Sequence, residues 1–161
     1  MGAGKVFCIL GGIITLVATF LLSFASFEIV PGVYFYLYYI GFLQNIGSVF
    51  TSGDMVIIIV GIVFLVCMFS GIFILIGVKS RALAIIGAIL AILLGGFFLL
   101  AFYQVLPPDV AVYIIFFFND ALVEGIIPLD ISLGIASLGT FIFLGGGVLG
   151  LIGGIMGPDD F

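Results

Sequence analysis

The chain has 161 residues and a net charge of −5, with 65% hydrophobic but only 7% charged residues. Because soluble domains carry about a quarter charged residues, this composition excludes a water-facing surface over most of the molecule. It predicts a single membrane-embedded domain, residues 1–161. Three basic residues are too few for a nucleic-acid surface, and a chain without histidine cannot build the usual haem, zinc or copper sites. We therefore expect neither a cofactor nor enzymatic activity.

Four apolar segments are long enough to cross a bilayer, which needs about 20 residues. Only Lys79-Ser80-Arg81 separates the second segment from the third, so these two should form an antiparallel hairpin. The pattern predicts an all-α membrane fold, an up-down four-helix transmembrane bundle. The expected spans are residues 6–27, 55–78, 82–103 and 131–156, and the two long outer loops are residues 28–54 and 104–130.

The charges divide between the two ends of this bundle. Lys5, Lys79 and Arg81 fall on one side, together with Asp159 and Asp160. Basic residues in short loops stay in the cytoplasm, so we expect both termini to be cytoplasmic, with the plasma membrane as the location. The acids expected on the outer side are Glu28, Asp54, Asp109, Asp120, Glu124 and Asp130.

Local signals mark the ends of the spans and the form of the first outer loop. Asp54 and Asp130 are expected to cap the outer starts of the second and fourth spans, and Gly157-Pro158 to end the fourth. The uncharged first loop contains Tyr34, Tyr36 and Tyr38. Their alternation fits a strand, but Tyr34 and Tyr38 with the later Phe42 also fit one face of a helix, so both interpretations stay open.

The second outer loop predicts an amphipathic helix lying on the outer leaflet or against a partner. Pro107-Pro108-Asp109 is a typical helix start, and Gly125 and Pro128 mark the end. Its polar stripe would consist of Asp109, Tyr113, Phe117, Asp120 and Glu124. The residues expected to make contacts at the outer face are Tyr34, Tyr36, Tyr38, Asp109, Tyr113, Asp120 and Glu124.

The acidic outer face has three interpretations. It is a solubilising surface with helix caps, or it attracts a basic partner or a divalent cation, or its groups are partly protonated in an acidic exterior. Asp120 and Glu124, one helical turn apart on the predicted helix, are the best local pair for a metal ion.

Small residues recur at intervals of four inside the spans. In lipid, helices associate by close backbone approach over such residues, so they pack either within one bundle or against another chain. The candidate packing and assembly residues are Gly146, Gly150, Gly154, Gly87, Ala91, Gly95, Gly11 and Thr15.

These patterns favour a non-enzymatic membrane protein that acts by helix–helix assembly. It would be a homo-oligomer or an accessory, structural subunit of a membrane complex. The absence of acids and bases from the interior of the spans argues against a pump or secondary transporter. The alternative is an oligomeric channel or transport component with an acidic outer vestibule. The expected partners are membrane lipid and either a second copy or another membrane protein.

The outline of four spans, a tight inner turn and two outer loops resembles tetraspanins and claudins. The resemblance covers the whole chain but is architectural. Claudins carry a W-GLW-C-C pattern in the first outer loop, whereas this chain has no tryptophan and no cysteine there. The Cys-Cys-Gly of tetraspanins is also missing, so no site residue of either family is transferred.

Overall fold

A computed structural model describes residues 2–157, so the predicted inner-side acids Asp159 and Asp160 lie outside the described residues. The chain is mainly helical in this range, with one two-stranded antiparallel sheet. In chain order the elements are α1 (Ala3–Leu21), β1 (Ala25–Val30), β2 (Val33–Leu37), α2 (Tyr39–Gln44), α3 (Ile46–Thr51), α4 (Met55–Ile76), α5 (Arg81–Phe102), α6 (Pro108–Ile115) and α7 (Leu138–Met156).

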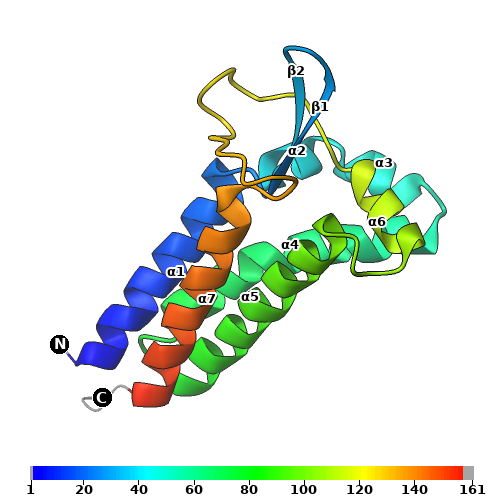
Figure 1. Ribbon diagram of the computed structural model, residues 1–161. Coiled ribbons are helices and arrows are strands. Elements are labelled where there is room, and N and C mark those ends of the chain that lie inside the picture. Colours follow the sequence, from blue (N-terminus) through cyan, green and yellow to red (C-terminus); the bar gives the residue numbers. More distant parts are fainter. Residues whose placement is uncertain (1, 158–161) are drawn as a thin grey trace.

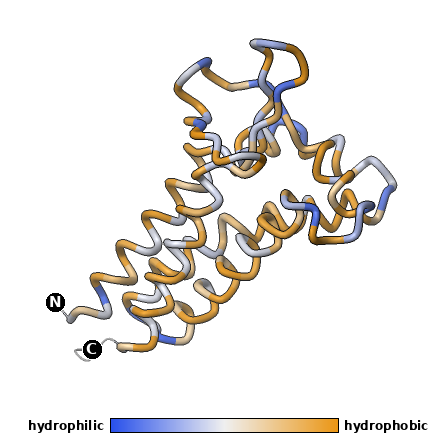
Figure 2. The backbone as a smooth tube through the Cα atoms, viewed as in Figure 1, coloured by the Kyte–Doolittle hydropathy of each residue, from blue (hydrophilic) through white to orange (hydrophobic). Residues whose placement is uncertain are grey.

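Helices α1, α4, α5 and α7 are long and apolar enough to cross a membrane. Helix α1 packs against α7 and α4, and α5 packs against the same two helices. The start of α1, the end of α7 and the α4–α5 turn lie at one end of these helices (Figure 1). The two long loops fold together at the other end; we call residues 22–54 and 103–137 the cap. Hydrophilic positions concentrate in the cap and at the opposite end (Figure 2).

The predicted first and fourth spans are longer than the helices that form. Helix α1 ends at Leu21 and α7 begins at Leu138, so residues 22–27 and 131–137 belong to the cap. Backbone hydrogen bonds join the segment after α1 to the segment before α7. The Ser23 amide donates to Leu129 O at 3.2 Å, and the Ser137 amide donates to Phe24 O at 2.9 Å. Hydropathy gives no signal for such long-range backbone pairing, which explains the error.

One of the two predicted aspartate caps is confirmed and the other is wrong. The Asp54 carboxylate accepts from the Val56 and Ile57 amides at 2.8 and 3.4 Å, at the start of α4. Asp130 lies well before α7, and its carboxylate instead accepts from the hydroxyls of Ser23 and Ser137. At the other end of α7, Gly157 follows the last helical residue with φ of 72°, a backbone conformation that favours glycine, and Pro158 lies outside the described residues.

The first loop uses both of the conformations that periodicity left open. Strand β2 pairs with β1 in a hairpin in which Glu28 is opposite Tyr34, and helix α2 follows directly. Tyr34 and Tyr36 lie on one face of β2, with their rings stacked at 6.4 Å between centroids. Tyr38 links the strand to the helix.

The second loop forms a helix much shorter than predicted. Helix α6 has Asp109 in its first turn but ends at Ile115. Beyond it Phe117 is buried in the core, and the Asn119 amide and carbonyl bond the backbone of Tyr36 at 2.9 and 2.8 Å. These contacts take the chain out of the helix, so the predicted polar stripe through Glu124 does not lie on one helix.

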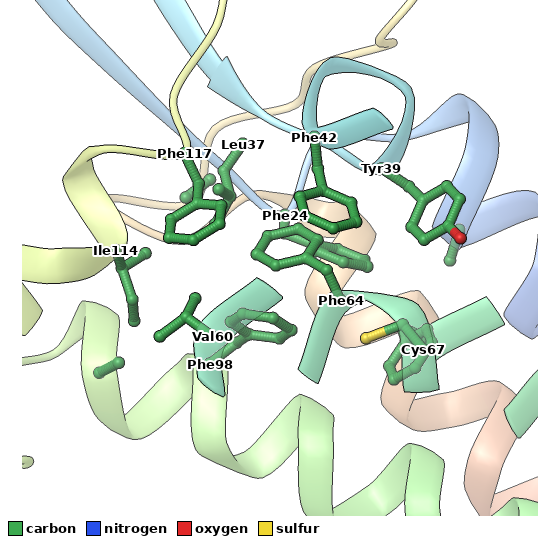
Figure 3. Packing of buried hydrophobic residues seen from close by; sticks show 14 of the residues in the cluster. Phe24, Leu37, Tyr39, Phe42, Val60, Phe64, Cys67, Phe98, Ile114 and Phe117 are labelled. Atoms are coloured by element: carbon green, nitrogen blue, oxygen red, sulfur yellow. The ribbon is translucent and has the colours of Figure 1, made fainter. Parts of the chain in front are cut away.

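An aromatic core joins the cap to the spanning helices (Figure 3). Phe64 of α4 lies between the cap and the spanning helices. Its ring stacks on those of Phe42 in α2 and Phe117, with 5.1 and 5.5 Å between ring centroids. The centroid of the Phe98 ring in α5 is 5.2 Å from that of Phe64. Phe24 contacts Phe98 at 5.3 Å. The cap and the bundle therefore share one core.

The small residues of the spans are buried at helix contacts within the chain. A Cβ added to Gly11 of α1 would lie 2.6 Å from the Gly150 amide nitrogen and 2.7 Å from the Gly146 carbonyl oxygen of α7. On the other side of α7, a Cβ at Gly154 would lie 2.8 Å from Ile85 of α5. The residues that are buried in this way include all the candidates from the sequence: Gly146, Gly150, Gly154, Gly87, Ala91, Gly95, Gly11 and Thr15.

Candidate recognition surface on the cap

A hollow of about 610 Å³ lies on the cap between the hairpin turn and the loop after Asn119. Tyr34 and Tyr36 of β2 line one side, and Asp120 and Glu124 line the other. We call it the acidic hollow. The fold thus brings together four residues that the sequence analysis expected at the outer face, from two loops that lie far apart in the chain.

Local hydrogen bonds hold the two sides of the acidic hollow in place. At the hairpin turn, the Gly32 amide donates to Glu28 Oε1 at 2.9 Å, and Gly32 has φ of 88°, which favours glycine. On the other side, the backbone pairing of Tyr36 with Asn119 places Asp120 beside the strand. The acidic hollow is therefore built on a paired backbone rather than on free loop ends.

Tyr38 is not a surface contact residue, contrary to the prediction. Its side chain is fully buried, and its hydroxyl donates to the carbonyl oxygen of Asp120 at 2.8 Å. Burial raises the pKa of this phenol above its ordinary value, and the Asp120 charge adds to the rise. Tyr38 therefore positions the loop that carries Asp120.

The charged side chains that line the acidic hollow, Asp120 and Glu124, are both acidic. Burial first, and then the nearby charges of Asp130, Tyr34 and Glu124, raise the pKa of Tyr36, so this phenol stays neutral at physiological pH. The three basic residues of the chain lie at the opposite end of the bundle, in α1, in the α4–α5 turn and at the start of α5. Two carboxylates beside two aromatic rings form an environment that favours a cation.

The other predicted contact residues, Asp109 and Tyr113, lie on α6 and do not line the acidic hollow. Tyr113 is close to Asp54, the N-cap residue of α4, and the Asp54 carboxylate raises the pKa of Tyr113 above its ordinary value. Tyr113 therefore lies at the contact between α6 and α4, and Asp109 is exposed in the first turn of α6.

Asp120 and Glu124 line the same hollow, but not for the predicted reason. Their segment is not helical, so they are not one helical turn apart. In residues 2–157 there is no group of three or more histidine, cysteine, aspartate or glutamate side chains placed to hold a metal ion.

Buried hydroxyl groups in the bundle have hydrogen-bond partners in the chain. Thr15 donates to Gly11 O at 2.7 Å, Ser70 to Cys67 O at 2.6 Å, and Thr140 to Phe24 O at 2.6 Å. Within the described residues no buried side-chain nitrogen or oxygen lacks a partner. These hydroxyls therefore stabilise packing, and a pore lined by them would need another arrangement of the helices.

Two features of the cap were not anticipated from the sequence. One is the bridge between Asp130 and the hydroxyls of Ser23 and Ser137. The other is an apolar cavity of about 420 Å³ beside α6, which includes Gln104 and Ala111 in its lining. Neither has a local sequence signal, because its residues come from segments separated by more than a hundred positions.

Comparisons of the chain with protein-family models, with curated proteins and with solved structures give no match. Function is therefore inferred from the geometry and chemistry of the cap.

Proposed function

We propose that the protein is a non-enzymatic, multi-pass accessory subunit that acts by assembling with another membrane protein. The spans would form an up-down bundle in the plasma membrane, with both termini in the cytoplasm and the cap outside. Support for a scaffold role comes from the small residues, which are used in contacts within the chain. The bundle then carries the cap, and the cap makes the specific contact.

The acidic hollow is the observation on which this proposal rests. A partner that inserts a lysine or arginine side chain between Tyr34, Tyr36, Asp120 and Glu124 gains charge pairing and cation–π contact. No basic residue of this chain lies at that end of the bundle. A second copy inserted in the same orientation would therefore have no lysine or arginine side chain near the acidic hollow. This favours a different protein with a basic outer loop over self-association.

The test is recovery of partners from native membranes in mild detergent, followed by mass spectrometry. We compare wild type with Asp120→Asn and Glu124→Gln, which keep the shape of the hollow and remove its charge. Asp109→Asn is the matched control, since it removes a cap carboxylate outside the hollow. Asp120→Asn and Glu124→Gln should each recover about fivefold less partner than wild type. The difference from wild type should become smaller at high salt, because salt screens the charge contribution in wild type.

Two results would contradict the proposal. One is a protein that runs as a lone monomer and recovers nothing from native membranes. The other is an equal loss of partner in Asp109→Asn and in the hollow variants, which would assign the effect to the overall charge of the cap.

A further inference from the structure

The second cavity of the cap lies where α5 leaves the bundle. It has a volume of about 420 Å³, within the range of small-molecule pockets, which is about 300–1,000 Å³. Its walls are the last turn of α5, helix α6, strand β1 and Ile135, and no charged side chain from the described residues lines it. We call it the apolar cavity.

The floor and the rim of the apolar cavity differ in exposure. Ala101 and Phe102 at its floor are buried, whereas Phe27, Val112 and Ile115 around it are more than half exposed, at 53%, 53% and 59%. Such a rim is unfavourable in water but ordinary where hydrocarbon covers it.

The last turn of α5 contributes both to the apolar cavity and to the exposed surface of the helix. Leu93 and Leu100 of α5 are exposed, at 63% and 46%, and Leu100 directly precedes the floor residue Ala101. If α5 spans the bilayer, these leucines contact lipid tails, and the same hydrocarbon layer leads to the cavity. The cavity would then lie at the edge of the hydrocarbon layer, where the acyl chains of that leaflet are its nearest apolar ligands.

The polar groups at the apolar cavity are few and neutral. Ser26 and Gln104 line it, and within the described residues neither side chain makes a hydrogen bond. Neutral donors and acceptors suit the ester or hydroxyl groups near the top of a lipid chain. We propose that the apolar cavity binds one acyl chain of a lipid from the leaflet on the cap side.

The test uses the purified protein in nanodiscs that contain phosphatidylcholine with a diazirine at the end of one acyl chain. After photolysis, adducts are mapped by mass spectrometry of chymotryptic peptides. Ala111→Trp should fill the cavity, whereas Leu93→Trp adds the same ring to the exposed surface of α5 outside it. Adducts in residues 101–118 should fall at least about fivefold in Ala111→Trp, and should stay at the wild-type level in Leu93→Trp.

A second variant, Ile135→Trp, places a tryptophan ring in the cavity from another lining position. It is used if Ala111→Trp does not fold. Wild-type adduct yields at the cavity in both variants would overturn the proposal. So would adducts spread evenly along α4 and α5, which indicate contact with bulk lipid only. Because this test uses the protein alone, its result is independent of the partner proposed for the acidic hollow.

Discussion

At the scale of single residues, Asp130 is the side chain whose role differs most from its sequence context. It stands before an apolar run, where an aspartate normally caps a helix. In the structure the run first passes through cap segment 131–137, and the carboxylate bridges two buried hydroxyls, with Ser137 Oγ at 2.5 Å. This bridge fastens the end of α1 to the start of α7.

Removing the bridge should destabilise the protein. Asp130→Ala leaves the buried hydroxyls of Ser23 and Ser137 without an acceptor, and each unpaired group costs about 1–3 kcal/mol. We expect a loss of about 2–4 kcal/mol in the free energy of unfolding, seen as a lower thermal midpoint in detergent. Asp130→Asn keeps one acceptor oxygen and should lose less. Ser132→Ala removes an exposed local hydrogen bond and is the control; an equal loss there would contradict this role.

At the scale of elements, α1 and α7 approach each other so closely that a Cβ atom at Gly11 would clash with the backbone of α7. This contact depends on positions where a side chain would meet backbone, such as Gly11 against Gly150. By contrast, Gly145 on the same α7 and Gly96 on α5 have open space around them. The glycines of the spans are therefore of two kinds, those at helix contacts and those on the outer surface.

This difference predicts opposite outcomes for the same substitution. Gly11→Ala forces α1 away from α7, because the backbone of α7 cannot rotate aside as a side chain does, and should cost about 1–3 kcal/mol. Gly145→Ala adds a methyl group in open space and should leave the thermal midpoint unchanged or slightly raised. Equal midpoints for the two variants in the same detergent would mean that the α1–α7 contact is not the one described.

At the scale of the whole molecule, charge separates the two ends of the bundle. Its basic residues lie at the end with the chain termini, and the acids of the described residues lie in the cap or at the edge of it. The proposed topology, with the cap on the non-cytoplasmic side, rests on this separation of charge.

Cysteine labelling in intact cells tests that orientation. Ser48→Cys lies on an exposed position of the cap, and Ser80→Cys in the α4–α5 turn at the opposite end. The native Cys8 and Cys67 are free but buried, so they should contribute little background. A membrane-impermeant maleimide should label Ser48→Cys in intact cells and Ser80→Cys only after lysis. The reverse pattern would invert the proposed topology.

Much of the membrane part of the fold was predictable from hydropathy. All four spanning helices were expected, and α4 and α5 formed within two residues of the predicted ends, because a charged turn and the Asp54 cap mark them. The errors fall at residues 22–27 and 131–137, where backbone pairing such as that of Ser137 with Phe24 replaces the helix. Phe24 and Ala136 are buried there in protein, whereas Ile131 and Ile135 are exposed.

The sequence by itself determined that four segments are long and apolar enough to cross a membrane, that the three basic residues separate from six of the eight acids, and that small residues line the helix contacts. Composition and spacing carry this information because lipid and helix geometry act on each segment locally. Only the tertiary structure decided that Tyr34, Tyr36, Asp120 and Glu124 surround one hollow, that Tyr38 is buried beneath it, and that Asp130 joins two serines. These groupings depend on long-range pairing, such as that of Tyr36 with Asn119, which no local pattern encodes.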